Sequence, residues 1–171
     1  GNLFRRQGEI ERAIRMHQNL LDRPDLPADR RTMASYELAQ DFLRAGMLDR
    51  AEQLFAKLEG TVYETQSLSH LIAIYEQEKD WPKAIAVTER VAELNRTPAN
   101  KEIAQYHCEI AQAALVKSDL AAARAGIERA LAVHRGCARA NLVAGDLAMQ
   151  EGNPAGALDL PWSVGYVYLP A

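Results

Sequence analysis

Residue types that could carry acid–base or metal chemistry are few and widely spaced in this sequence. The four histidines are His17, His70, His107 and His134. The sequence contains neither Cys-x-x-His nor His-x-x-x-Cys, and it lacks G-x-x-x-x-G-K-[ST], G-x-G-x-x-G, G-x-S-x-G and H-E-x-x-H, the motifs of phosphate loops, dinucleotide sites, hydrolases and zinc proteases. We therefore interpret the histidines as structural or surface residues.

The two cysteines, Cys108 and Cys137, lie 29 residues apart, and no CxxC occurs. His107 directly precedes Cys108, so on a helix the two side chains point in different directions and do not suit one metal ion. The favoured interpretation is two reduced, partly buried thiols in a reducing compartment; a disulfide or a metal site is the alternative.

Carboxylate pairs such as Glu9 and Glu11 are placed near expected helix ends, where they act as caps or solvated charges. Acid–base catalysis by a carboxyl group needs a buried group with a perturbed pKa in a cleft, and nothing in the sequence requires one. We therefore predict that the chain is not an enzyme and holds no catalytic, cofactor or metal site.

Composition narrows the possible partners. The 171 residues are 48% hydrophobic, and 20 Lys and Arg stand against 23 Asp and Glu, for a net charge of −3. A nucleic-acid-binding surface would show a basic excess, and a membrane span would need about 20 apolar residues in a row. The balance predicts no nucleic acid partner and no direct membrane contact, and it leaves protein partners.

A repeated phrase is the most informative feature. It begins with Gly or another turn residue and ends five residues later in Ala. It occurs as Gly8–Ala13, Gly46–Ala51, Lys79–Ala84, Ser118–Ala123 and Gly152–Ala157. Successive alanines are 38, 33, 39 and 34 residues apart. A period of 34 with short insertions is typical of the tetratricopeptide repeat, a pair of antiparallel helices called A and B.

Each part of the phrase has a physical role. Its first residue ends helix A, where a left-handed backbone conformation suits glycine. The following residues turn the chain and start helix B, and the alanine lets the two helices cross closely. The prediction is an all-α, right-handed superhelix of antiparallel helix pairs that is truncated at both ends.

The array should cover residues 1–158, about four and a half units. An irregular tail should cover 159–171, because prolines, a glycine and β-branched residues disfavour a helix there. The expected helices are 9–22, 29–45, 48–59, 62–78, 81–95, 98–117, 120–134 and 137–151. Apolar residues at spacings of three and four run through these segments.

Helix A side chains line the concave face of such a superhelix, so they are the candidate binding surface. Counting from the turns, we predict a mixed polar and apolar protein-binding groove. Its residues are Tyr36, Gln40, Arg44, Gln66, Ser69, Glu76, Gln105, Gln112, Arg139 and Asp146. The same count also assigns Cys108 and Leu115 to outward positions. The groove lacks the concentrated Lys, Arg and Asn side chains expected of a clamp for a peptide carboxylate.

Several strings resemble a more specific family, that of lipopolysaccharide assembly protein B, in both order and spacing. They are Asn2–Gln18, Ala45–Glu52, Asp80–Ile85 and Glu102–Ala111. The resemblance covers about residues 1–158 and implies a longer parent with an N-terminal membrane anchor, a cytoplasmic repeat array and a C-terminal rubredoxin-like metal module. This fragment would be soluble and without a cofactor, since the metal ligands of that module have no counterpart here.

The resemblance implies an adaptor at the cytoplasmic face of the inner membrane of Gram-negative bacteria. Such an adaptor regulates lipid A biosynthesis by bringing a biosynthetic deacetylase to a membrane AAA+ protease. Two alternatives stay open: a peptide-binding repeat domain with another client, and a regulatory repeat domain of a glycosyltransferase.

The first repeat starts inside its helix A, so Phe4, Ile10 and Ile14 should lose a stacking neighbour. A repeat array normally ends in a polar cap. We therefore expect an apolar end that supports a homodimer through exposed repeat ends.

Overall fold

The protein is seen in a computed structural model that describes residues 9–153, and every regular element in that range is an α-helix. The helices are α2 (Ile10–Leu21), α3 (Ala28–Arg44), α4 (Leu48–Ala56), α5 (Glu64–Glu78), α6 (Trp81–Asn95), α7 (Asn100–Val116), α8 (Leu120–Val133) and α9 (Ala138–Gln150). Phe4, the alanine of the fifth phrase and the predicted tail 159–171 lie outside the described residues. None of the described helices is both long and apolar enough to cross a bilayer.

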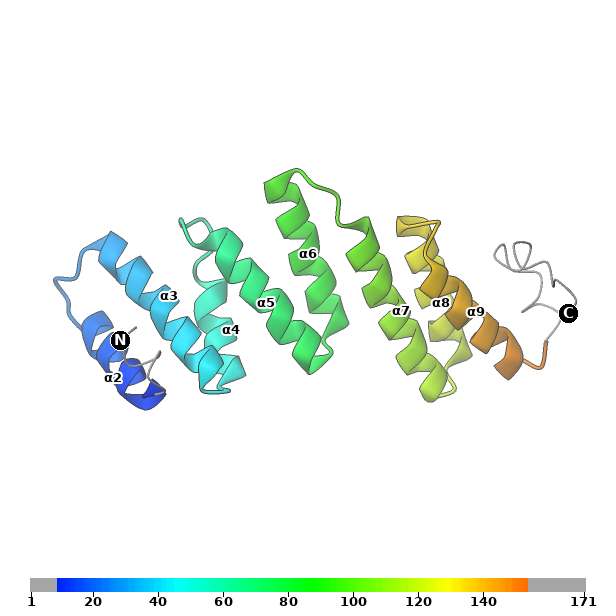
Figure 1. Ribbon diagram of the computed structural model, residues 1–171, viewed down its shortest axis with the longest axis horizontal. Helices are drawn as coiled ribbons and strands as arrows, with labels where there is room; N and C mark the ends of the chain where they lie inside the picture. Colours follow the sequence, from blue (N-terminus) through cyan, green and yellow to red (C-terminus); the bar gives the residue numbers. More distant parts are fainter. Residues whose placement is uncertain (1–8, 154–171) are drawn as a thin grey trace, which may run out of the picture. The chain divides into compact units, whose positions relative to one another are not determined.

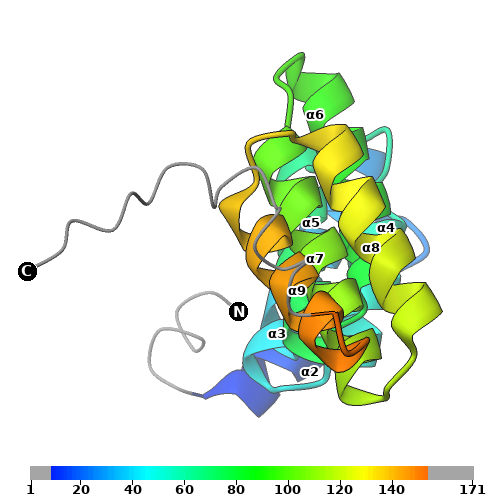
Figure 2. The ribbon, with the colours of Figure 1, turned by 90° about the vertical axis from the view of Figure 1, so that its right-hand side faces the viewer.

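The chain divides into two compact units, Gly1–Asp80 and Trp81–Ala171. In the first unit, α3 packs against α2 and α4, and α4 packs against α5 (Figure 1). In the second unit, α7 packs against α6, α8 and α9 (Figure 2). Within each unit successive helices are antiparallel, so the predicted all-α repeat of helix pairs is confirmed.

The repeated phrase forms the same backbone turn in four described copies. Its first residues have positive φ, at 73° for Gly46, 59° for Lys79, 57° for Ser118 and 71° for Gly152. The next N–H in each copy donates to the carbonyl five residues earlier. These bonds are Met47 N to Phe42 O, Asp80 N to Tyr75 O, Asp119 N to Ala114 O and Asn153 N to Ala148 O, each 2.9 Å. This left-handed cap closes helix A and directs the chain into the next helix.

The alanines of the phrase lie at buried helix crossings. Ala13, Ala51, Ala84 and Ala123 are each 0% exposed, as predicted for residues at which two helices cross closely. The crossing of α7 and α8 is closer still at Gly126. A Cβ built there would lie 2.9 Å from the Ala111 Cβ.

Helix α4 is shorter than the predicted 48–59, since it ends at Ala56. After Ala56 the hydrogen bonds span three residues instead of four: Leu58 N donates to Phe55 O, and Thr61 N donates to Leu58 O. Gly60 then has a φ of 73°, a left-handed conformation that suits glycine and does not continue an α-helix. The other helix ends fall within two residues of the prediction.

A buried polar pair joins the first two helices. His17 Nδ1 of α2 lies 2.6 Å from Asp41 Oδ2 of α3, and the Asp41 side chain is 0% exposed. Ile14 of α2, expected at an exposed end, is instead 8% exposed, because the described unit buries it. The predicted homodimer through repeat ends therefore gets no apolar surface from Ile14, and it stays a prediction.

Candidate protein-binding surface

In the first unit, the predicted groove residue Tyr36 belongs to an aromatic cluster built by three helices and a loop. Its ring stacks on Tyr63, with centroids 4.5 Å apart and planes 14° apart. The Tyr36 hydroxyl lies 3.4 Å from His70 Nε2 on α5, and the His70 ring stacks on buried Phe55 of α4 at 4.8 Å. Because both tyrosines are half-buried, the stacked rings form an aromatic platform that is partly accessible to solvent.

Burial also changes the acid–base behaviour of His70. Removal of the ring from water disfavours its charged form, so the pKa of His70 is lowered from its ordinary value. The neutral ring is therefore the form that the cluster holds, and it can either donate to or accept from the Tyr36 hydroxyl.

The other predicted residues of the first unit lie on α3 and α5. Gln40 is half-buried in α3, and Arg44 is exposed in the last turn of the same helix. On α5, Gln66, Ser69 and Glu76 are exposed. The Ser69 hydroxyl donates to the Thr65 carbonyl of its own helix at 3.0 Å.

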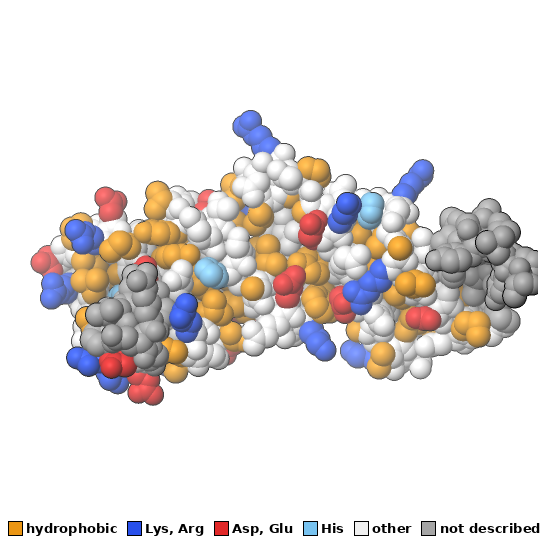
Figure 3. Space-filling view, in the orientation of Figure 1, with side chains coloured by type: hydrophobic (Ala, Val, Ile, Leu, Met, Phe, Trp, Pro, Cys, Tyr) orange, Lys and Arg blue, Asp and Glu red, His pale blue; other side chains and the backbone are white. Residues whose placement is uncertain are grey.

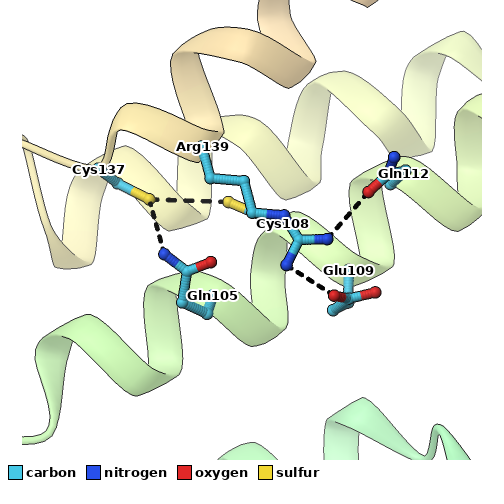
Figure 4. A network of polar contacts seen from close by, with 6 residues as sticks. All are labelled: Gln105, Cys108, Glu109, Gln112, Cys137 and Arg139. Carbon is cyan, nitrogen blue, oxygen red and sulfur yellow. Dashed lines mark hydrogen bonds and ion pairs between the residues drawn. The ribbon is translucent and has the colours of Figure 1, made fainter.

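In the second unit, Arg139 is the centre of a polar network between α7 and α9 (Figure 4). Its guanidinium contacts Glu109 Oε1 at 2.6 Å and donates to Gln112 Oε1 at 2.9 Å. Besides Arg139, the sequence analysis predicted Gln105, Gln112 and Asp146 in this region. Gln105 lies one turn before Glu109 on α7 and contacts the Cys137 sulfur at 3.8 Å, while Asp146 is exposed on α9. The structure therefore brings Gln105, Gln112 and Arg139 into one surface.

Two residues assigned to outward positions are buried instead. Cys108 is 0% exposed because the start of α9 covers it, and it packs with Ala104, Ala130, Cys137 and Ala140. Leu115 is 5% exposed within a second cluster that contains Ile127 and Val143. The sequence count failed there because α7 packs against three helices, so less of its surface faces solvent. The prediction of two free thiols fits the structure, except that both are fully rather than partly buried.

The accessible side chains are chemically mixed. On α9, Leu142 and Met149 are 59% and 61% exposed. They lie on the same helix as Arg139 and Asp146. Figure 3 shows hydrophobic side chains interspersed with Lys, Arg, Asp and Glu on the face it presents. Mixed surfaces of this kind are typical of non-obligate protein interfaces.

Two observations concern metal-ligating and acid–base side chains among the described residues. Within residues 9–153 there is no group of three or more His, Cys, Asp or Glu side chains placed to hold a metal ion. The closely paired His17 and Asp41 are largely enclosed, since the His17 side chain is 12% exposed. That pair joins α2 to α3, and His17 also lines a surface pocket with Met16, Asn19, Leu20 and Arg23.

Three residues of the surface were missed by the sequence analysis: Tyr63, His70 and Glu109. Tyr63 falls inside the expected helix 62–78, but in the structure it precedes α5 as the N-cap residue, and the count of outward helix positions did not select it. Glu109 is four residues after Gln105 and three before Gln112, so the helical spacing alone would have added it to that face.

Comparison with known proteins gives a family match and close relatives. A tetratricopeptide repeat model matches residues 1–62 and 108–160. Lipopolysaccharide assembly protein B of Escherichia coli K12 is 36% identical over 160 residues, which are 93% of this chain and 41% of that protein. Its counterpart in Haemophilus influenzae is 37% identical over 153 residues, 89% of this chain and 38% of that protein. The chain thus spans about two fifths of the length of the curated relatives it matches.

Two solved structures are similar to the chain at low TM-score and low sequence identity. BtubC (BKLC) from P. vanneervenii has a TM-score of 0.47 at 17% identity, with 99% of this chain and 80% of that chain covered. MamA MSR-1 C2 has a TM-score of 0.45 at 16% identity, with 91% and 84% covered.

Proposed function

The chain belongs to the tetratricopeptide repeat family, and from that premise we propose that it is the protein-binding part of an adaptor in lipopolysaccharide assembly. The observation that carries the proposal is the 36% identity to lipopolysaccharide assembly protein B over 93% of the chain. Tetratricopeptide repeats are stacked helix pairs whose extended surfaces bind other proteins. The proposal assigns no catalytic step, metal or cofactor to this chain.

The proposed partners are a biosynthetic deacetylase of lipid A and a membrane AAA+ protease. The adaptor would hold both at the cytoplasmic face of the inner membrane, so that the protease degrades the deacetylase and lipid A synthesis slows. Binding to this chain would be through protein contacts, with the membrane attachment supplied elsewhere in a longer protein.

Two features of the described residues support a binding role. The Tyr36–Tyr63 stack is a half-buried aromatic anchor of the kind enriched at interface hot spots. The Arg139 network presents fixed hydrogen-bonding groups on α7 and α9, because Glu109 and Gln112 hold the guanidinium. A partner can thus bind without first ordering these side chains, which lowers the entropic cost of association.

A pair of matched glutamine variants tests the proposed surface. Gln66 of α5 and Gln53 of α4 are both exposed helical residues, but only Gln66 belongs to the predicted groove. We expect Gln66→Glu to weaken capture of the purified deacetylase or protease by the immobilised 171-residue chain, and Gln53→Glu to leave it unchanged. Circular dichroism of both variants checks that the helices persist.

The possible outcomes test the proposed adaptor role and the proposed binding surface separately. If the chain retains neither protein, in isolation or joined to the remaining parts of its longer relatives, the proposed adaptor role is wrong. If it retains one and both glutamine variants bind equally well, the role stands and the groove assignment around Gln66 fails.

A further inference from the structure

Cys108 and Cys137 form a close thiol pair inside the second unit. Their sulfurs are 3.8 Å apart, and the residues are 0% and 2% exposed (Figure 4). Both thiols are free. The chain contains only these two cysteines, so each has one possible disulfide partner within the molecule.

The surroundings of the pair leave the sulfurs facing each other. The cluster around them is completed by Ala104, Ala130 and Ala140, whose side chains carry no polar atom. Besides the thiols themselves, Gln105 Nε2 contacts the Cys137 sulfur at 3.8 Å. A disulfide needs a sulfur–sulfur distance of about 2.05 Å, so the sulfurs must approach by roughly 1.8 Å.

The backbone can supply this approach at one of the two positions. Cys108 is in the middle of α7, whereas Cys137 is the residue that precedes α9, with φ −71° and ψ 97°. A short loop, His134–Cys137, connects α8 to it, and Cys137 N donates to His134 O in this loop. Helix ends open locally at lower free energy than helix centres. Cys137 can therefore meet a small oxidant and move towards Cys108 while α7 stays intact.

We propose that Cys108 and Cys137 are a dithiol that a peroxide oxidises to an intrachain disulfide, which links the centre of α7 to the start of α9. Cys137 is the thiol that attacks, and Cys108 is the thiol that resolves. The ligand class is a small hydroperoxide, and the pair is a buried modification site that borders the binding surface through the contact between Gln105 and the Cys137 sulfur.

The reaction balances in two steps. The Cys137 sulfur attacks one peroxide oxygen, the O–O bond breaks, and the released hydroxide takes up the thiol proton to give water and a sulfenic acid. The Cys108 sulfur then attacks the Cys137 sulfur, the S–O bond breaks, and the hydroxyl leaves with the Cys108 proton as a second water. The peroxide is reduced, and the two thiols are oxidised to one S–S bond.

The acid–base state of Cys108 agrees with this order. Burial, with the adjacent Cys137 as the next cause, raises the pKa of the Cys108 thiol to about 12. Cys108 thus stays protonated near neutral pH and is a poor first nucleophile. Against a sulfenic acid held beside it, Cys108 transfers its proton to the departing hydroxyl as the S–S bond forms, and the high local concentration of the electrophile offsets the small thiolate fraction.

Mass spectrometry of the folded 171-residue chain tests the site. After treatment with hydrogen peroxide, we expect a loss of two hydrogen masses and a peptide that joins Cys108 to Cys137, both reversed by dithiothreitol. The four methionines, which are exposed at 38% to 61%, gain oxygen and so report the oxidant dose in the same spectrum. The oxidised chain should also melt at a higher temperature than the reduced chain.

Matched single variants separate the roles of the two thiols. In Cys108→Ser, a dimedone adduct should accumulate on Cys137, while Cys137→Ser should give little adduct on Cys108. Circular dichroism shows whether each variant is folded, and the wild-type peptide map decides the question if either is not. Methionine oxidation without the joined peptide, or a joined peptide that forms only in urea, would overturn the proposal.

Discussion

Replacing Gly126 with alanine should destabilise the second unit, although alanine is the better helix former. The added Cβ would lie 2.9 Å from the Ala111 Cβ and 3.1 Å from both the Ala111 Cα and its nitrogen. Carbon atoms in optimal contact are about 3.5–4.0 Å apart. None of these atoms can rotate away, because they belong to the backbone of α7 or are attached directly to it. The two helices must therefore separate.

The size of the effect follows from two opposing contributions. Overpacking costs about 1–3 kcal/mol, and the rigid neighbours place this site in the upper half of that range. The higher helix propensity of alanine offsets about 1 kcal/mol of this cost. The expected result is a free energy of unfolding about 1–2 kcal/mol lower than that of the wild type, measured by urea unfolding monitored with circular dichroism.

Gly136 provides the matched control. A Cβ there would have only His134 ring atoms nearby, the nearest at 3.5 Å, which is an ordinary contact. Gly136→Ala should therefore stay within about 0.5 kcal/mol of the wild type. If Gly126→Ala unfolds at the same urea concentration as the wild type, or at a higher one, the close crossing of α7 and α8 does not limit the residue at this position.

Two further predictions concern the turn and the aromatic cluster. Lys79→Gly should raise the free energy of unfolding by about 0.5–1 kcal/mol in urea titrations, because the left-handed conformation at φ 59° costs a side-chain-bearing residue more than it costs glycine; an unchanged midpoint would contradict this. Burial lowers the pKa of His70, so at low pH the unfolded chain binds a proton at this residue more readily than the folded chain does. The contribution of the neutral His70 ring to the free energy of unfolding should therefore be complete above pH 6.5 and decrease as the pH falls below 6.5. His70→Phe, which keeps a ring on Phe55, should flatten this part of the stability–pH curve, and an unaltered slope would count against a buried neutral ring.

The sequence was most informative where one physical requirement recurs. Every unit requires a small residue at the helix crossing and a residue that turns the chain before it. The phrase therefore recurs five times in the sequence, and it predicted the four turns that the structure describes. Cys108 and Leu115 show the limit, since whether a helix A position faces solvent depends on how the next helix packs over it. Tyr63 shows another limit: a loop residue joins the surface through a stacking contact that no helical period encodes.

The left-handed turn keeps the same backbone geometry inside and outside the stretches that the family model matches. The two stretches matched by the family model flank residues 63–107, which contain the turn at Lys79. That turn keeps the same backbone bond, Asp80 N to Tyr75 O at 2.9 Å, with lysine in the glycine position. A bond between main-chain atoms does not depend on side-chain identity, so Gly, Lys and Ser can each occupy the first position of the turn in this chain. The four described copies therefore share the hydrogen-bonded turn itself and not the residue that begins it.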